Sequence, residues 1–225
     1  NCFFANPFVY SGDSRYRRGY GFYAENANVT VTDCVFTNHT DTTGGYYNRG
    51  AAIHVSGGSL SVTDADFLDN KITQGNYNNG GGAAVYIQGN AEANFTNCLF
   101  RGNQVQAGSG RENAGGAIHV YNTGSSTVTV KECTFLFNVA TYGGAVYAQD
   151  GAVVIDHCTI TSNRARTAGS KLGRGGAIYA RLGNVTVVNS ILWTNAADDA
   201  GADVYNENGT VAMDYNNLSG SKSDS

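Results

Sequence analysis

Residues 141–163 read TYGGAVYAQDGAVVIDHCTITSN, and closely similar segments recur along the chain. Each copy begins with small residues followed by an apolar one, as in Gly144-Ala145-Val146. The apolar position is held in turn by Phe22, Ile53, Val85, Ile118, Val146, Ile178 and Val204. A repeat of roughly 20 to 50 residues predicts a solenoid, a propeller or another array of stacked units.

A second motif follows each copy, in which a small residue precedes a bulky one by two positions. The small position is held by Cys2, Cys34, Ala65, Cys98, Cys133, Cys158, Ser190 and Asn216. The bulky position is held by Phe4, Phe36, Phe67, Phe100, Phe135, Ile160, Leu192 and Leu218. Cysteine is therefore interpreted as a small buried residue that Ala or Ser can replace. A disulfide between neighbouring copies, such as Cys133 to Cys158, is the alternative in an oxidising compartment.

Apolar and polar residues alternate within each copy, as in Thr127-Val128-Thr129-Val130, which predicts β-strands. The strands are separated by two-residue corners such as Thr32-Asp33, too short for the hairpin-linked strands of a propeller blade. The sequence predicts an all-β, single-domain (1–225), right-handed parallel β-helix of about eight coils. Equivalent side chains should stack in columns about 4.8 Å apart, with the Phe column inside.

Two kinds of corner residue support this fold. Glycine opens each copy where the corner requires a positive φ or a close approach of backbone. The position before the small residue is held by Asn1, Asp33, Asp64, Asn97, Glu132, His157, Asn189 and Tyr215. Its Asn and Asp members suit left-handed corners and side-chain to backbone hydrogen bonds. We interpret this column as structural, with a metal-binding acidic column as the alternative.

Composition excludes several function classes. Only 14% of residues are charged and the formal net charge is −4, so no basic surface is expected for nucleic acid. No apolar run approaches the roughly 20 residues of a membrane-spanning helix. The five cysteines lack CxxC spacing, so no zinc site, other metal site or cofactor is predicted.

The repeated tetrapeptides Gly-Gly-Ala-Ile (115–118 and 175–178) and Phe-x-x-Asn (67–70, 100–103 and 135–138) resemble the repeats of chlamydial polymorphic outer-membrane proteins. More broadly, the chain is similar to bacterial extracellular β-helix repeat proteins over almost its whole length. The resemblance implies an adhesive β-helix that is secreted or displayed on a cell surface. It is specific for the fold and says less about function, because one fold carries many activities.

The residue after the apolar motif position is aromatic in every copy, and alternation places it outside the core. These residues are Tyr23, His54, Tyr86, His119, Tyr147, Tyr179 and Tyr205. They are predicted to form an outward stripe that binds sugars or a partner protein. The alternative is that neighbouring aromatic side chains only stabilise adjacent strands.

The segments of variable sequence all leave from one corner of the coil. They are 40–49, 71–80, 104–114, 139–142, 164–174 and 196–200. Such insertions often form the binding face of a solenoid. Their candidate contact residues are Tyr46, Tyr47, Arg49, Tyr77, Arg111, Glu112, Arg164, Arg166, Lys171 and Arg174.

Enzymatic function is not predicted, and no catalytic residue is assigned. The densest acidic groups are Asp64, Asp66 and Asp69, and Asp198, Asp199 and Asp203. Neither group repeats on the next coil beside a matching Arg or Lys, as a polysaccharide lyase or hydrolase would require.

Six Asn-x-Ser/Thr sequons are candidate glycosylation sites: Asn28, Asn38, Asn94, Asn184, Asn208 and Asn217. At positions 28, 94 and 184 the Asn and its Thr flank an inward residue, so both should face solvent.

We therefore expect an extracellular or cell-surface structural or adhesive unit that is not an enzyme. Its open ends predict self-association, with copies stacking into a filament. A glycan or a cell-surface molecule is the other expected partner. The alternative function is a carbohydrate-binding or polysaccharide-cleaving module.

Overall fold

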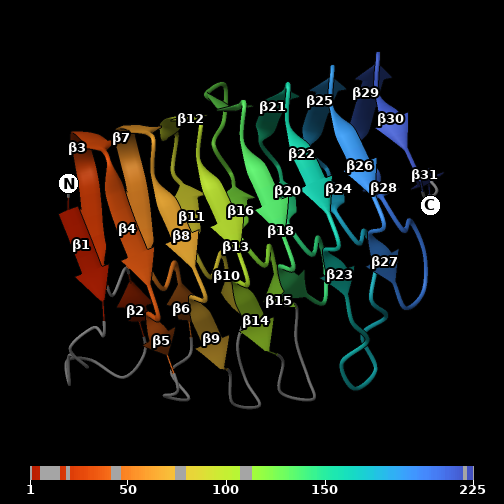
Figure 1. Ribbon diagram of the computed structural model, residues 1–225, viewed down its shortest axis with the longest axis horizontal. Coiled ribbons are helices and arrows are strands. Elements are labelled where there is room, and N and C mark those ends of the chain that lie inside the picture. The colour runs from red at the N-terminus through yellow and green to blue at the C-terminus, as the bar shows by residue number, and fades with distance from the viewer. Residues whose placement is uncertain are drawn as a thin grey trace.

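The computed structural model describes residues 2–5, 16–18, 21–41, 47–73, 80–106, 113–219 and 222–224. The strands lie side by side along the long axis, with β1 at one end of the stack and β31 at the other (Figure 1). The chain winds repeatedly through parallel sheets, so sequence neighbours lie in different sheets and each strand pairs with its equivalent one coil away.

The largest sheet has 13 strands, and in most coils the chain crosses it twice, before and after a bend. Its strands are β3 (Phe22–Thr32), β7 (Ile53–Thr63), β11 (Val85–Gln88), β12 (Glu92–Thr96), β16 (Ile118–Tyr121), β17 (Thr127–Lys131), β20 (Val146–Gln149), β21 (Ala152–Asp156), β24 (Ile178–Arg181), β25 (Asn184–Val188), β28 (Val204–Glu207), β29 (Thr210–Asp214) and β31 (Lys222–Asp224).

Three smaller sheets complete the coil. The eight-stranded sheet contains β1 (Cys2–Ala5), β4 (Cys34–Thr37), β8 (Asp66–Leu68), β13 (Leu99–Arg101), β18 (Thr134–Leu136), β22 (Thr159–Thr161), β26 (Ile191–Trp193) and β30 (Asn217–Leu218). The six-stranded sheet contains β5 (Thr40–Asp41), β9 (Lys71–Thr73), β14 (Gln104–Gln106), β19 (Val139–Ala140), β23 (Arg164–Ala165) and β27 (Ala196–Ala197). The four-stranded sheet contains β2 (Tyr16–Arg18), β6 (Tyr47–Arg49), β10 (Gly80–Gly81) and β15 (Asn113–Ala114).

The all-β, parallel solenoid class is as predicted. The number of complete turns is about 5 rather than the predicted eight. The difference arises because the coils at both ends contribute strands to only some of the four sheets.

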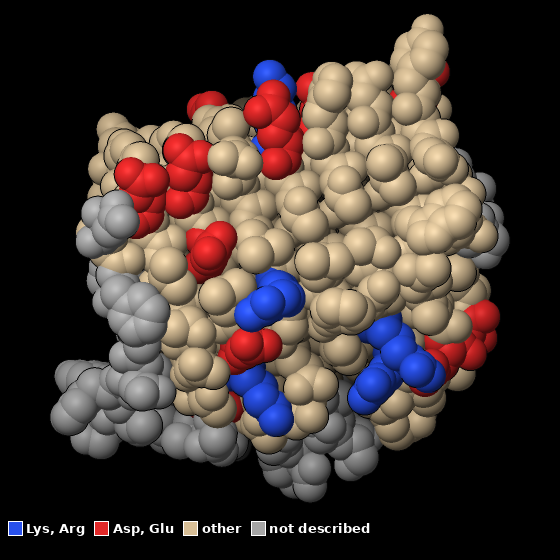
Figure 2. Space-filling view, viewed as in Figure 1, with Lys and Arg blue, Asp and Glu red and all other residues tan. Residues whose placement is uncertain are grey.

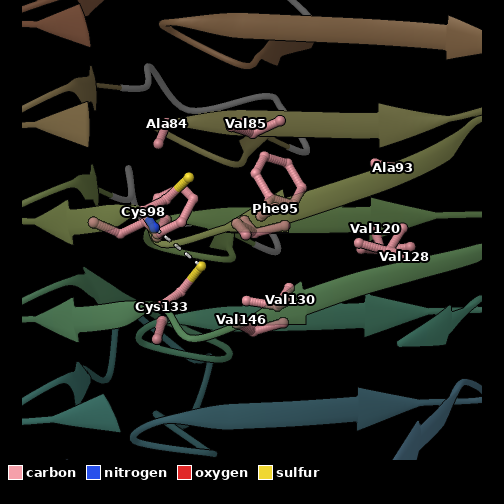
Figure 3. Close-up of a cluster of buried hydrophobic side chains, with 14 of the residues drawn as sticks. Ala84, Val85, Ala93, Phe95, Cys98, Val120, Val128, Val130, Cys133 and Val146 are labelled. Atoms are coloured by element: carbon pink, nitrogen blue, oxygen red, sulfur yellow. Dashed lines mark hydrogen bonds between the residues drawn. The ribbon is translucent and has the colours of Figure 1, made fainter. Parts of the chain in front are cut away.

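The bulky column of the second motif lies inside the solenoid, as predicted. Phe36, Phe67, Phe100 and Phe135 are fully buried and in register. Their rings stack with centroids 5.0, 4.8 and 4.6 Å apart and interplanar angles of 6° or less. Ile160 and Leu192 continue the column. Figure 3 shows how valine side chains from several coils fill the interior beside Phe95.

The cysteines of the small column are free thiols, and those at 34, 98, 133 and 158 are buried. The backbone N–H of Cys98 donates to Sγ of Cys133 at 3.3 Å (Figure 3), and that of Cys133 donates to Sγ of Cys158 at 3.4 Å. Ser190 accepts the next such bond, from the N–H of Cys158, at 3.0 Å. The small column is therefore also a column of weak acceptors, which explains why Ser can replace Cys.

The corners adopt the predicted left-handed conformation. From Asp33 to Tyr215, the residues before the small column have φ between 51° and 55°. Glycine holds a second column of corners, at positions 50, 82, 115, 143, 175 and 201, with φ between 61° and 67°. A Cβ at Gly143 would lie 2.1 Å from the carbonyl oxygen of Val146, so this corner requires glycine.

A ladder of buried asparagines runs beside the Phe column. It consists of Asn70, Asn103, Asn138, Asn163 and Asn195, all at least nine-tenths buried. Each side-chain amide donates to Oδ1 of the next Asn at 2.9 to 3.0 Å, except in the last coil. Each also donates to the backbone carbonyl of the Phe-column residue in the preceding coil, as Asn138 does to Phe100 at 2.9 Å. The ladder therefore satisfies the polar backbone groups of the corner without water.

Candidate functional site

The seven aromatic residues that follow the apolar motif position form one column, as predicted. Their register is continuous from Tyr23 to Tyr205. Neighbouring ring centroids are 4.7 to 5.3 Å apart. The prediction that this column faces outward is wrong. His54, Tyr86, His119, Tyr147, Tyr179 and Tyr205 are buried, and Tyr23 is half-buried.

The column is buried because another layer of the coil covers it. Its side chains point away from the main core but toward the glycine corners and the four-stranded sheet that precedes them. A Cβ at Gly81 in β10 would lie 1.8 Å from Nδ1 of His119, which shows how closely this layer packs. Tyr142 contacts Tyr147 and Tyr179 in the same way, with ring centroids 6.4 and 5.0 Å away. The column is therefore a second core, and none of its buried members can be a surface platform.

Cations of the covering layer contact this second core. The guanidinium of Arg49 lies 5.0 Å from the ring centroid of Tyr86 and donates to Oε1 of Gln88 at 2.7 Å. Arg174 lies 4.9 Å from the ring centroid of Tyr205 and donates to its hydroxyl at 3.0 Å. Both side chains were predicted as candidate contact residues of the variable segments. The structure shows them packing on aromatic rings of their own chain.

His119 is a buried imidazole within the second core. Neither of its ring nitrogens has a hydrogen-bond partner among the described residues. Desolvation by burial, with a further contribution from the charge of Arg49, lowers the pKa of His119 to about 3. The imidazole is therefore neutral at physiological pH, and its protonation would place a charge among tyrosine rings.

Several residues of the predicted acidic groups have structural partners. Asp64 accepts a hydrogen bond of 2.6 Å from the side-chain amide of Asn97. Asp198 pairs with Arg164 at 2.9 Å, and Asp199 pairs with Arg174 at 2.6 Å. Asp203 is fully buried. Within the described residues, no three His, Cys, Asp or Glu side chains gather as a metal site.

Some predicted contact residues lie outside the part of the chain that the structure describes. These are Tyr46, Tyr77, Arg111 and Glu112, and the side chain of Tyr47 is not described either. Of the rest, Arg164 and Arg166 are exposed and Lys171 is half-buried.

The three best-placed sequons lie on the outer side of the largest sheet. Asn28 and Asn184 are exposed, and Asn94 is half-buried. Asn28 and Asn184 each accept a hydrogen bond from a hydroxyl of the next coil, Ser59 at 2.9 Å and Thr210 at 2.6 Å. Asn38, Asn208 and Asn217 are also exposed, but Asn38 and Asn208 have positive φ at corners.

An exposed apolar surface on the eight-stranded sheet was not predicted from the sequence. In β26 the outward residues Ile191 and Trp193 are 45% and 47% exposed. Phe137, 58% exposed, holds the corner position that Ser162 and Thr194 occupy in the next two coils. We call this surface the Trp193 face and define it as Phe137, Thr161, Ser162, Ile191, Trp193 and Thr194.

The hydroxyls of the Trp193 face form a cluster between its aromatic residues. Oγ1 of Thr194 lies 3.1 Å from Oγ1 of Thr161 and 3.1 Å from Oγ of Ser162. Figure 2 shows this side of the molecule without Lys, Arg, Asp or Glu over β22, β26 and β30, whereas charged side chains lie over the coils nearer β1 and along the lower edge. The face is therefore uncharged, partly apolar and rich in hydroxyl groups.

The stacked parallel sheets and their internal ladders define this molecule as a parallel β-solenoid. The family model described as the right handed beta helix region matches residues 3–224, and the chain belongs to this family. The match also confirms the predicted handedness. No curated protein and no solved structure shows significant similarity to the chain. The described residues contain no helix that is long and apolar enough to cross a membrane.

Proposed function

We propose that this protein is a non-enzymatic adhesive rod of the cell surface or extracellular space, and that it binds its partner through the Trp193 face. The observation that carries the proposal is the exposure of Trp193, 47%, beside Ile191 on a surface that lacks charge. An exposed apolar patch with polar residues around it is typical of an interaction site. The resemblance of the repeats to chlamydial surface proteins also favours this role.

The disposition of the polar groups supports a structural rather than a catalytic role. The buried asparagines are used to join successive coils, as Asn103 joins Asn138 at 3.0 Å. Carboxylates such as Asp198 and Asp199 are engaged by arginines of the preceding coil. The buried tyrosines and His119 fill the second core.

The chemistry of the Trp193 face fits an uncharged glycan of a cell surface. An indole ring offers a flat apolar platform for the C–H side of a sugar ring. The hydroxyls of Thr161, Ser162 and Thr194 supply donors and acceptors for the sugar hydroxyls. Phe137 and Trp193 are two coils apart, about 10 Å at the spacing of parallel strands, so one oligosaccharide can contact both.

Trp193 is the single tryptophan of the chain, so its fluorescence reports directly on this face. We expect neutral oligosaccharides selected on a glycan array to change the emission and to protect it from aqueous quenchers. Trp193→Ala should abolish binding to the same glycans on the array. Leu182→Ala removes a side chain that is 57% exposed on another side of the coil, and should bind like the wild type. Equal binding by Trp193→Ala and the wild type would show that the proposal is wrong.

End-to-end association is a second proposed property, and the two ends of the largest sheet favour it. Phe22 and Val29 at one end and Val211 and Met213 at the other pack on the core but are only partly buried. Leu218 of the bulky column is 37% exposed. A second copy stacked on either end would continue these columns and pair the strand edges.

Light scattering on a dilution series tests this association. We expect the wild type to form larger species as concentration rises, and Met213→Lys to remain monomeric while it keeps the strand content of the wild type by circular dichroism. Thr129→Lys places the same charge on the outer side of the sheet as a control. A wild type that remains monomeric at all concentrations would exclude self-association.

A further inference from the structure

The connection that follows the six-stranded sheet is much shorter in one coil than in its neighbours. The chain takes 14 residues from Gln104 to Ile118 and 14 from Arg164 to Ile178, but only 7 between the equivalent residues Val139 and Val146. The short connection leaves a notch between the coils on either side. A cavity of about 320 Å³ occupies this position.

The notch has an apolar floor and polar walls. Val139 and Ala140 of β19 line its floor. Gln104 and Gln106 of β14 form one wall, and Arg166 and Thr167 form the other. The side-chain amides of Gln104 and Gln106 make no hydrogen bond within the described chain, so they are free to bind a ligand. Ligand sites commonly combine an apolar surface with a few polar groups in this way, although this one is small.

Arg166 is the positively charged residue that lines this notch. Two neighbouring arginines are engaged, Arg164 with Asp198 and Arg174 with Asp199. Arg166 forms no ion pair within the described residues.

Asp198 interacts electrostatically with Arg166, but its two carboxylate oxygens are already bound to other groups. The backbone N–H of Thr167 donates to Oδ2 at 2.9 Å, and Arg164 donates to Oδ1 at 2.9 Å. These bonds, with the one from Thr167 first, hold the pKa of the Asp198 carboxyl below its ordinary value. Asp198 therefore offsets part of the charge of Arg166 without occupying its guanidinium.

We propose that the notch binds a sugar residue that carries a carboxylate, with Arg166 holding the carboxylate and the two glutamines holding ring hydroxyls. The planar guanidinium fork binds carboxylates through two parallel hydrogen bonds. Amide groups can donate to and accept from hydroxyls, and the half-buried side chain of Val139 packs against the C–H side of the ring. This site lies on the six-stranded sheet and is separate from the Trp193 face. The proposal therefore does not depend on whether the Trp193 face binds a glycan.

Calorimetric titration of the whole chain with methyl glucuronide tests the proposal, with methyl glucoside as the neutral probe of the same shape. We expect the glucuronide to bind and the glucoside to bind at least about tenfold more weakly, because it lacks the carboxylate that Arg166 would hold. Arg166→Ala should lower the affinity for the glucuronide about tenfold or more, and Gln106→Ala should lower it several-fold. Val139→Phe should block the site without changing its charge.

Arg101→Ala is the matched control, because Arg101 is an exposed arginine on the eight-stranded sheet. It should bind the glucuronide like the wild type. Equal affinity for the two sugars, or unchanged binding by Arg166→Ala, would overturn the proposal. Inorganic phosphate and acetate serve as competitors. If either binds as tightly as the glucuronide, the notch is a simple anion site and the sugar assignment is wrong.

Discussion

The side-chain amide of Asn195 donates a hydrogen bond of 2.9 Å to Oδ1 of Asp203, and both residues are buried. Asp203 occupies the position that Ala177 and Ala145 hold in earlier coils, as the hydrogen bonds of Ile178 and Val146 show. It supplies the acceptor that the next asparagine supplies elsewhere in the ladder. A carboxylate therefore ends the ladder at the point where the asparagine column stops.

Replacement of Asp203 should reveal this role. Asp203→Ala leaves one N–H of Asn195 buried without an acceptor, so we expect a loss of about 1 to 3 kcal/mol in the free energy of unfolding. Asp203→Asn keeps an acceptor for Asn195, so it should lose less stability than Asp203→Ala. Urea denaturation measures both. An Ala variant as stable as the Asn variant would contradict the assignment.

The glycine corner at Gly143 should not tolerate a side chain. Gly143→Ala places a Cβ 2.1 Å from the carbonyl oxygen of Val146 at a φ of 62°. We expect the free energy of unfolding to fall by about 2 kcal/mol or more, measured by urea denaturation. At Gly89, where φ is also positive, the nearest atom lies 3.5 Å from an added Cβ. Gly89→Ala should therefore lose only the roughly 1 kcal/mol that a left-handed conformation costs, and equal losses at the two sites would refute the steric argument.

The burial of Tyr147 predicts a loss of folding stability when its ring is removed. Tyr147→Ala should lower the free energy of unfolding by about 3 to 5 kcal/mol, as for other large buried side chains. Tyr147→Phe keeps the ring and removes the hydroxyl, which donates a hydrogen bond of 3.3 Å to Gln149, so it should lose much less stability than Tyr147→Ala. Thermal unfolding followed by circular dichroism distinguishes the two. A stable Ala variant would restore the view that this ring lies on a surface.

His119 should make the fold sensitive to mild acid. Its pKa of about 3 in the folded state lies below the ordinary value of 6.5, so the unfolded chain binds more protons between these two pH values. Stability should therefore fall as the pH is lowered from 6.5 toward 3, by about 2 kcal/mol at pH 5 from this group.

His119→Phe keeps an aromatic ring in the second core and should remove most of this dependence between pH 7 and pH 5. His157→Asn alters an exposed corner histidine and should retain the slope of the wild type. Denaturant midpoints measured across the pH range provide the comparison. The same slope in His119→Phe and the wild type would show that another group dominates.

The exposed sequons on the largest sheet should accept glycans in a eukaryotic secretory host. Asn28 and Asn184 are both exposed on the outer side of this sheet. The glycosylated protein should migrate more slowly in gel electrophoresis, and glycosidase treatment should abolish this difference. Asn28→Gln and Asn184→Gln should each reduce the difference by the contribution of one glycan. Modification at neither residue would show that the hydrogen bonds from Ser59 and Thr210 hold these side chains out of reach.

Much of the fold could be predicted because each coil must match its neighbours. The Phe column, the glycine corners and the left-handed position of Asp64 all follow from identical residues at equivalent places. The direction of Tyr147 could not be predicted in this way. Alternation tells which side of a strand a residue faces, but not whether another layer covers that side.

The Trp193 face and the notch were missed for a different reason. Outward residues need not repeat, and Trp193 has Thr161 as its equivalent in the preceding coil. The notch depends on the relative lengths of three connections. The intervals between repeats contained this signal, since the copy from Ile118 to Val146 is shorter than the copies before and after it.

The asparagine ladder also constrains how such a molecule changes in evolution. A residue inserted within a strand would shift one amide out of line and interrupt hydrogen bonds on both sides. Extra residues are tolerated where the chain leaves the six-stranded sheet, and entire repeats can be duplicated without disturbing the rest. The length of the rod can therefore change only by complete coils, and homologous proteins should differ in length by whole repeats.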